Sequence, residues 1–364
     1  MLGEQLRDEF LRRSGSLDTT ALEVDPADEM LRTTARHVVR QHQELQTYFR
    51  RGLDAFHVLE HVQRALGRPL RELDAILDFA AGWGRLTRFL VGETGASRVV
   101  VSDIAEASTA FCRRVFGVDS FDSAVDPSEV EPSRTFDLIF VGSLFTHLPR
   151  NRFDAWMERL LSWLSPEGSL VLTTHGEGLL QAEDRDASGF SYIGSTPIDY
   201  LPVSEYASTY VHPSLVEQVA RSCGAAQVVT RERDLWFVHD VHVVRNQVAP
   251  ALEAISPTPI AHGRIERAEE VRPGHGWVGG TVNVPRALAP LASVELFVDG
   301  ELLGPFSRLQ ESELPAESPG LIRYEFLEEG GVSGLGAGTH LVAAVAAWAN
   351  GEKACVDVVP MTVA

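Results

Sequence analysis

The spacing of apolar residues along the chain changes twice, and each change predicts a different kind of structure. Between residues 28 and 66, apolar side chains recur every three or four positions among Arg, Gln and His, which predicts amphipathic helices. From Leu73 to about residue 248, short apolar runs alternate with helix-length segments, a pattern typical of a parallel sheet with right-handed crossovers. Beyond residue 260, apolar and polar positions alternate with a period of two, which predicts strands.

Two groups of strands are therefore expected, separated by a linker with three prolines between residues 250 and 259. In the first group, the runs at residues 226–230 and 235–244 are so close that they predict an antiparallel hairpin. In the second group, Asp299-Gly300 stands between apolar runs, where a tight hairpin turn requires positive φ angles. The other predicted strands are residues 75–79, 98–101, 137–141 and 169–173, and then residues 278–284, 293–303, 321–327, 339–348 and 355–363.

These patterns predict an α/β protein with an additional all-β domain. A chain of 364 residues exceeds the usual size of a single core, which also favours more than one domain. We expect an N-terminal helical extension over residues 1–66, an α/β domain over residues 67–248 and a β-sandwich of the immunoglobulin-like type over residues 260–364.

Composition excludes several classes of function. The chain has 51 acidic and 32 basic residues, a net charge of −19, so its surface should repel phosphate backbones and no nucleic-acid partner is expected. Lys353 is the only lysine, which argues against a Schiff-base enzyme or a phosphate-binding loop with its lysine. No apolar run approaches the ~20 residues that span a bilayer, and the first residues lack a secretory signal. We therefore expect a cytoplasmic protein that is not inserted in a membrane.

The sharpest local feature is the segment from Asp78 to Thr87, where a buried strand passes through a turn of small residues into a helix. Gly82 and Gly84 let the backbone approach a ligand closely at the carboxyl end of the strand, where open α/β sheets bind their ligands. Nicotinamide enzymes use Gly-x-Gly-x-x-Gly here, but Thr87 occupies the position of the third glycine. An acid at the start of the turn suits a ligand that carries an amino group and a sulfonium rather than two phosphates.

The run from Asp78 to Gly84 resembles the first motif of class I methyltransferases, Asp/Glu-x-Gly-x-Gly-x-Gly. Ala80 departs from the first glycine of that motif, whereas Gly82 and Gly84 remain. A second acid, Asp103, ends the next predicted strand 19 residues after Gly84, where a carboxylate can accept hydrogen bonds from both ribose hydroxyls. The same residue can also cap the helix that follows, and the two roles are compatible.

Two further segments are similar to the same family. Residues 136–149 look like the family's Phe-Asp-x-Ile-x-x-x-Ser-x-x-x-His-Leu segment, and residues 164–172 look like its Leu-x-Pro-Gly-Gly turn and fifth strand. Together with the closing hairpin, these motifs imply a seven-stranded Rossmann-like methyltransferase sheet. The resemblance covers roughly residues 45–245, and several motifs in the correct order are more specific than any one of them.

The resemblance implies S-adenosyl-L-methionine as the cofactor and assigns residues to its parts. Asp78 and the small-residue turn should face the methionine part, and Asp103 the ribose. Tyr48, in the N-terminal helices, should close over the bound cofactor together with Gly52. Residues after the third strand should contact the adenine, and residues after the fourth strand the sulfonium methyl. The full implied set is Asp78, Ala80, Ala81, Gly82, Gly84, Asp103, Ile104, Ser123, Ala124, Gly142, Ser143 and Tyr48.

Methyl transfer to a hydroxyl requires a base in addition to correct positioning of donor and acceptor. His147 and His175 are the candidates, because each follows the carboxyl end of a predicted strand, where the acceptor should lie. For His147, capping or bridging beside the cofactor is the preferred interpretation. His175 is the stronger candidate for proton abstraction.

The connection between His175 and Pro213 is long and rich in aromatic residues. Connections in this position are usually lids or walls of a substrate site. Aromatic faces with hydroxyl tips suit a saccharide or another small polyhydroxylated acceptor, and they equally suit the interface of a homodimer. The residues concerned are Phe190, Tyr192, Tyr200, Tyr206, Tyr210 and His212.

The preferred function is O-methylation of a saccharide or similar small hydroxylated acceptor. One alternative keeps the enzyme class and changes the acceptor atom to a nitrogen or carbon of a natural product. The other is a non-catalytic scaffold that binds S-adenosylmethionine and recruits a partner through its sandwich.

Asp240 and His242 share one face of a predicted strand, but with no third ligand nearby in the sequence no metal site is predicted.

Overall fold

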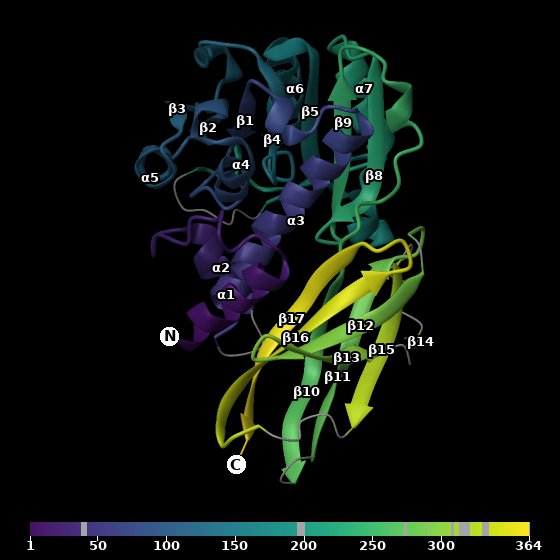
Figure 1. The fold of residues 1–364 in the computed structure, drawn as a ribbon. Coiled ribbons are helices and arrows are strands. Elements are labelled where there is room, and N and C mark those ends of the chain that lie inside the picture. Colours follow the sequence, from purple (N-terminus) through teal and green to yellow (C-terminus); the bar gives the residue numbers. More distant parts are fainter. Residues whose placement is uncertain are drawn as a thin grey trace. The chain divides into compact units, whose positions relative to one another are not determined.

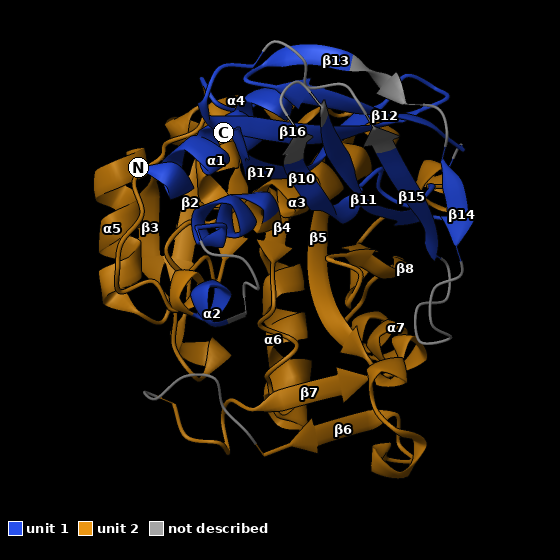
Figure 2. Cartoon of the chain, turned by 90° about the horizontal axis from the view of Figure 1, so that it is seen from below, with its two compact units in different colours: residues 1–18, 33–50, 256–364 blue, residues 19–32, 51–255 orange. Residues whose placement is uncertain are grey.

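The computed structural model describes residues 1–37, 42–194, 201–272, 275–288, 290–306, 309–312, 321–329 and 335–363 (Figure 1). The chain divides into two compact units, coloured separately in Figure 2. Unit 1 contains residues 1–18, 33–50 and 256–364, and unit 2 contains residues 19–32 and 51–255. No helix in the described ranges is both long and apolar enough to cross a membrane.

Unit 2 is built on a largely parallel sheet in which five strands follow the order β3-β2-β1-β4-β5. The two strands predicted as a hairpin, β8 and β9, are antiparallel to each other, and β9 is antiparallel to β5. This arrangement confirms the Rossmann-like fold class. The strands are β1 (Ile76–Phe79), β2 (Val99–Asp103), β3 (Asp119–Asp122), β4 (Phe136–Val141), β5 (Leu164–Gly176), β8 (Gln227–Leu235) and β9 (His239–Arg245).

Helices connect these strands, as the alternating pattern predicts. The residues Phe153, Trp156 and Leu160 of α6 are buried in one core cluster with Leu77 of β1 and Ile139 of β4. The helices and short 3-10 turns of unit 2 are α4 (Thr87–Thr94), α5 (Glu106–Phe116), α6 (Arg150–Ser162), α7 (Pro213–Ser222), η1 (Leu70–Glu72), η2 (Ala96–Arg98), η3 (Pro127–Glu129), η4 (Glu177–Leu179), η5 (Ala182–Asp184) and η6 (Pro250–Leu252).

The sheet of unit 2 has nine strands, two more than the expected seven. The additional strands, β6 (Phe190–Ile193) and β7 (Ser208–Val211), form an antiparallel hairpin within the connection predicted as a lid or wall. Strand β7 extends the far end of β5 through the parallel pairs His175 with Tyr210 and Gly176 with Val211. Strands of four residues in a polar, aromatic segment give too short a pattern to be detected from the sequence.

Unit 1 contains two four-stranded antiparallel sheets that share one buried apolar core. Their orders are β10-β11-β15-β14 and β13-β12-β16-β17. At the predicted tight turn, Asp299 and Gly300 both have positive φ, 47° and 89°, as expected. The immunoglobulin-like assignment of this all-β region remains a prediction. The strands are β10 (His262–Arg272), β11 (His275–Pro285), β12 (Leu291–Val298), β13 (Glu301–Phe306), β14 (Gln310–Ser312), β15 (Leu321–Glu329), β16 (Gly338–Trp348) and β17 (Lys353–Val363).

The N-terminal residues do not group as one extension. Helix α1 (Leu2–Arg13) belongs to unit 1, whereas α2 (Glu29–His37) and α3 (Glu44–Ala65) contribute residues to both units. Within unit 1 the buried carboxylate of Asp357 accepts hydrogen bonds from Gln43 at 3.0 Å, from Gln46 at 2.9 Å and from the Ile265 amide at 2.9 Å. The predicted domain boundaries at residues 66 and 260 therefore stay predictions. The two compact units divide the chain at other residues.

Candidate active site

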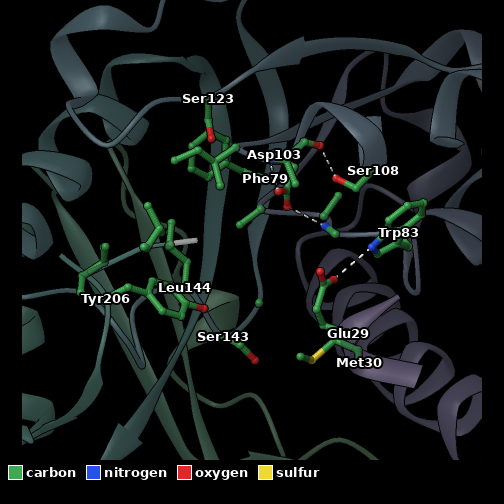
Figure 3. A pocket seen from close by; sticks show the side chains of 18 of the residues that line it. Glu29, Met30, Phe79, Trp83, Asp103, Ser108, Ser123, Ser143, Leu144 and Tyr206 are labelled. Atoms are coloured by element: carbon green, nitrogen blue, oxygen red, sulfur yellow. Dashed lines mark hydrogen bonds between the residues drawn. The ribbon is translucent and has the colours of Figure 1, made fainter. Parts of the chain in front are cut away.

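A pocket opens in unit 2 at the carboxyl ends of β1, β2 and β4, where open α/β sheets bind their ligands (Figure 3). It encloses about 1190 Å³ of space, part of it open to solvent. Nine of the predicted cofactor-binding residues line it, namely Ala80, Ala81, Gly82, Asp103, Ile104, Ser123, Ala124, Gly142 and Ser143. These residues come from four loops, and the sheet topology places all four loops at one edge, as the sequence predicts.

The turn after β1 has an unusual backbone. Ala80, Gly82 and Gly84 have φ angles of 56°, 54° and 73°, so all three motif positions lie in the left-handed region. A Cβ on Gly82 would meet no atom within 4 Å, so this glycine is required for its backbone conformation alone. A Cβ on Gly84 would lie 2.3 Å from Cε2 of Phe116, so the ring of this residue of α5 occupies the space that a side chain would need. Gly84 itself does not line the pocket; it supports the turn from the packed side.

Asp103 ends β2 and presents its carboxylate to the pocket. Its Oδ2 accepts a hydrogen bond from the Gly82 amide at 2.8 Å, and its Oδ1 accepts one from the Ala105 amide at 2.9 Å. Burial raises the pKa of this carboxyl, and the two backbone hydrogen bonds oppose that shift. Each carboxylate oxygen can accept a further hydrogen bond, so the group can bind two adjacent donors such as a pair of hydroxyls.

Asp78 is buried beside the pocket and is not one of the residues that line it. Its Oδ2 accepts a hydrogen bond from the Thr87 hydroxyl at 2.7 Å. Burial raises the pKa of Asp78 to about 7; the bond from Thr87 opposes this rise, and the nearby charge of Asp103 adds to it. The structure therefore places this carboxyl as a support between β1 and α4, and direct contact with a ligand stays a prediction.

The end of β4 supplies a second unusual backbone position at the pocket. Ser143 has a φ of 64°, rare for a residue with a side chain. Its amide donates a hydrogen bond to Oγ1 of Thr173 on β5 at 2.9 Å. Gly142 precedes it, and a Cβ there would lie 2.8 Å from the ring of Phe140. The wall of the pocket after β4 is therefore held in one conformation.

Another wall comes from a segment that the sequence analysis did not assign to the site. Asp28, Glu29 and Met30, at the start of α2, line the pocket, and Oε2 of Glu29 accepts a hydrogen bond from Nε1 of Trp83 at 3.1 Å (Figure 3). Asp28 caps the helix by accepting from the Met30 amide at 2.7 Å. In the sequence, this helix start is indicated by an acidic residue at the capping position before a helical pattern.

Tyr48 does not line the pocket, in contrast to the prediction that it closes over the cofactor. Its side chain is fully buried in unit 1, where its ring packs edge-on against Phe49 at 5.7 Å. Gly52 has a different role from the predicted one, because a Cβ there would lie 2.1 Å from the Arg85 carbonyl oxygen. The small residue allows α3 to approach the segment that leads into α4.

His147 and His175 lie next to each other, with ring centroids 6.4 Å apart, although neither lines the pocket. His147 stacks at 4.5 Å on Tyr206, which does line it. Nδ1 of His147 is 2.7 Å from the Ala207 carbonyl oxygen, so Nδ1 carries the proton in this bond. Burial lowers the pKa of His147. Neither His147 nor Ala207 lines the pocket, so a capping or bridging role of His147 beside the cofactor stays a prediction.

His175 sits at the end of β5 among aromatic rings. It stacks on Tyr210 at 5.2 Å, and its edge meets His239 at 4.7 Å. Its Nδ1 is buried and has no hydrogen-bond partner within the described ranges. Burial, reinforced by His147, lowers the pKa of His175 to about 4. The ring is therefore neutral at neutral pH, with a nitrogen that can accept a proton.

The other aromatic residues of the predicted connection have varied roles. Phe190 is buried in the core of unit 2, and the hydroxyl of Tyr192 donates to the Val203 carbonyl. His212 caps α7 by accepting from the Ser214 amide at 3.2 Å. Tyr200 lies outside the described residues. Among the described members of this set, Tyr206 reaches the pocket.

Asp240 and His242 are each engaged in hydrogen bonds within the sheet. Oδ1 of Asp240 accepts from the Arg233 amide at 2.8 Å, while the ring of His242 lies between the hydroxyls of Thr174 and Thr230, each at 2.8 Å. No group of three or more potential metal ligands occurs in the described part of the chain. Both side chains are buried, and both have hydrogen-bond partners within the sheet.

Comparison with known proteins defines the class of the α/β unit. Residues 76–168, from β1 into β5, match the family model described as "Methyltransferase domain". Unit 2 therefore carries a methyltransferase domain, in agreement with the resemblance found in its motifs.

Several known proteins are similar to this chain. Malonyl-[acyl-carrier protein] O-methyltransferases from Calditerrivibrio nitroreducens and Acetivibrio thermocellus are each 26% identical to this chain, over 149 and 141 residues. The matches cover 41% and 36% of this chain and 54% and 49% of those proteins, so the chain spans about half the length of the curated relatives it matches. Among solved structures, the DhpI-SAM-HEP complex has 17% identity and a TM-score of 0.38, and covers 61% of this chain and 100% of that chain. An O-methyltransferase family protein from Burkholderia thailandensis has 13% identity and a TM-score of 0.42, and covers 68% of this chain and 71% of that chain.

Proposed function

We propose that unit 2 binds S-adenosyl-L-methionine and transfers its methyl group to a hydroxyl oxygen of a small polyhydroxylated acceptor, such as a saccharide. The observation that carries the choice of a hydroxyl is the neutral ring of His175 with its buried, unpartnered Nδ1. A neutral hydroxyl must lose a proton during methylation, and a neutral ring nitrogen with no hydrogen-bond partner can accept it.

The residues of the pocket fit this cofactor. The positive-φ turn from Ala80 to Gly82 exposes backbone rather than bulky side chains, which leaves room for the methionine part. Asp103 can accept from the two ribose hydroxyls while keeping its two backbone bonds. Ser123 and Ala124 line the pocket after β3, where the adenine would lie. The carboxylates of Asp103, Asp28 and Glu29 also favour a cationic ligand over a dinucleotide with two phosphates.

The cofactor, when bound, supplies a methyl group already activated on a sulfonium. The protein's contribution is then mainly to hold the acceptor oxygen in line, and such positioning can supply about 7 kcal/mol or more. Ser143, fixed by Thr173, shapes the pocket after β4. His175 accepts the hydroxyl proton at Nδ1 as the oxygen gains the methyl group, and later releases it to solvent. Its pKa of about 4 keeps it unprotonated and ready for this step at neutral pH.

The far part of the pocket provides surfaces suited to an acceptor with both apolar and polar faces. Tyr206, Trp156 and Leu144 offer aromatic and aliphatic contacts. Arg152 lines the same region and bonds Glu205 at 3.1 Å, so donors and acceptors of fixed position face the cavity. Ring faces beside paired polar groups suit a sugar ring, whose hydroxyls and C–H faces alternate.

The names of the two curated relatives favour oxygen as the acceptor atom, and they add a second candidate. Those proteins are described as methylating malonyl-[acyl-carrier protein] on oxygen. An acyl group on a carrier protein is therefore the second acceptor to test. A nitrogen or carbon acceptor has no specific observation in its favour in the structure.

Cofactor binding and acceptor choice can be tested separately. Isothermal titration should show binding of S-adenosylmethionine, and Asp103→Asn should weaken it about 10-fold or more, because a charged acceptor of two hydroxyls is lost. Asp119→Asn is the matched control, since this exposed residue of β3 does not line the pocket. An unchanged affinity in Asp103→Asn would overturn the proposed cofactor site.

Turnover should then be measured as release of S-adenosylhomocysteine with a panel of monosaccharides, glycosides and small polyols, with malonyl-[acyl-carrier protein] in parallel. The proposal predicts release with at least one hydroxylated acceptor. Release with the malonyl carrier protein alone would select the second candidate. Tight cofactor binding with no release on any oxygen acceptor would contradict O-methylation and favour the scaffold alternative.

A further inference from the structure

The tight turn between β8 and β9 has a strained backbone. The Val238 amide donates to the Leu235 carbonyl at 3.3 Å, so Trp236 and Phe237 occupy the two central positions of the turn. Their φ angles are 54° and 60°. Turns with two positive φ angles normally carry Asn-Gly or Asp-Gly, and bulky aromatic residues are outliers there. Strain of this kind persists only where the surroundings hold it, and it gathers at functional sites.

The strand leading into this turn is held from two other directions. Arg233 also has a positive φ, 53°, in a bulge of β8, and its amide donates to Oδ1 of Asp240 at 2.8 Å. Oδ2 of Asp240 lies 2.6 Å from where a Cβ of Gly176 would be, so the absence of that side chain allows the carboxylate to pack there. The hairpin end is thereby fixed against the end of β5.

Trp236 is the residue that the strained turn directs inward. Its Nε1 donates to the Arg51 carbonyl at 3.0 Å. The guanidinium of Arg85, a residue that lines the pocket, lies 4.9 Å from the centroid of the indole. The indole also packs edge-on against His239, with centroids 4.9 Å apart. Trp236 thus connects the pocket wall at Arg85 with His239.

His239 in turn contacts His175. The two residues are directly opposite each other in the antiparallel pair of β5 and β9, and their rings meet edge to face at 4.7 Å and 86°. Nδ1 of His239 lies 3.2 Å from Oγ1 of Thr173, which itself accepts from the Ser143 amide. Thr173 therefore links the Ser143 amide at the pocket with the ring of His239.

We propose that Trp236 and His239 are positioning residues for His175, and that the strained turn exists to hold them there. The inference rests on the proposed function, in which His175 accepts the proton. Through this chain of contacts, the His175 ring is held in one orientation by His239, Tyr210 and His147. Trp236 and His239 can position His175 in this way without touching the acceptor themselves.

The first test separates positioning from cofactor binding. Trp236→Leu and His239→Ala should lower kcat about 10-fold or more, while the affinity for S-adenosylmethionine stays within about twofold, because a misplaced base affects chemistry rather than cofactor binding. Trp236→Phe, which keeps an aromatic ring against His239, should restore much of the lost kcat. Val238→Ala is the matched control, as an exposed residue of the same turn, and should behave as the wild type.

The second test needs no turnover and so remains decisive if the proposed function fails. Nitrogen-15 spectra of labelled histidines should show His175 as one neutral tautomer in the wild type, with a titration midpoint near 4. In Trp236→Leu and His239→Ala, both tautomers should appear and the midpoint should move up towards the ordinary value of about 6.5. A His175 tautomer and midpoint identical in the wild type and both variants would overturn the inference, whichever acceptor the enzyme uses.

Discussion

Asp78 offers the clearest quantitative test of how the α/β unit is built. Its pKa is about 7 instead of the ordinary value of 3.8, because burial disfavours the charged form. The difference of about three pKa units corresponds to about 4 kcal/mol of stability. Because the folded-state pKa is raised, this stability is fully present below pH ~3.8 and is lost as the pH rises to about 7. Above that pH, the folded protein carries a buried charge.

Asp78→Asn removes the ionisation and keeps an oxygen that can accept from Thr87. Relative to the wild type, the variant should therefore gain stability as the pH rises, by about 3 kcal/mol between pH 5 and pH 8. Urea titration at both pH values can be followed by hydrogen exchange in peptides from residues 76–94, so that the measurement reports unit 2 alone.

Asp137 provides a control of opposite sign. Burial alone would raise the pKa of this partly buried carboxyl, but hydrogen bonds from Ser165 and from the Asp74 amide, with the charge of Arg68, lower it overall. Its stabilising contribution is fully present above the unfolded pKa of about 3.8 and is lost as the pH falls through the lowered pKa, so the stability deficit of Asp137→Asn should grow as the pH rises towards about 4 and then stay constant between pH 5 and pH 8. A stability difference between Asp78→Asn and the wild type that is the same at pH 5 and pH 8 would refute the reasoning about Asp78.

Three further predictions concern the turn and the base. Ala80→Gly should raise the free energy of unfolding by about 0.5–1 kcal/mol in thermal denaturation, because it relieves a φ of 56°, and a loss of stability would contradict the assigned conformation. Gly84→Ala should lower it by about 2–4 kcal/mol in urea titration through the clash with Phe116, whereas Gly117→Ala, with a φ of 70° and open surroundings, should lower it by only about 1 kcal/mol. His175→Ala should reduce kcat about 100-fold or more and leave cofactor affinity within twofold, and wild-type turnover in this variant would remove His175 from the mechanism.

The sequence was sufficient for the parts of the site that follow directly from strand ends. Asp103, Ser123 and Gly142 come from three different loops, yet all line one pocket, because the carboxyl ends of parallel strands meet at one edge of the sheet. The conformation of the turn at Ala80 could also be predicted from the sequence, because its glycines and other small residues indicate positive φ angles. A local pattern combined with a known sheet order is enough to bring such residues together.

Contacts between distant segments could not be predicted in this way. The start of α2 at Glu29 reaches Trp83, 54 residues away, and nothing in the local pattern of either segment specifies the other. Tyr48 illustrates the converse, because the family resemblance implied a cover for the cofactor, whereas its side chain is buried in unit 1. Helical periodicity tells which face is buried, but it does not tell against which partner.

Backbone strain gives an indication of the site that is independent of any family motif. Of the seven residues other than glycine with positive φ in the described chain, five lie at Ala80, Ser143, Arg233, Trp236 and Phe237. Ala80 and Ser143 line the pocket after β1 and β4, whereas Arg233, Trp236 and Phe237 belong to the end of the β8–β9 hairpin, where Trp236 contacts His239. At Arg233, Trp236 and Phe237 the positive φ opposes the preference of the residue type, so the sequence pattern does not predict it there. Backbone strain at the pocket and beside His239, in contrast to the favourable Asp-Gly turn at Asp299, is itself an argument that these positions serve chemistry rather than stability.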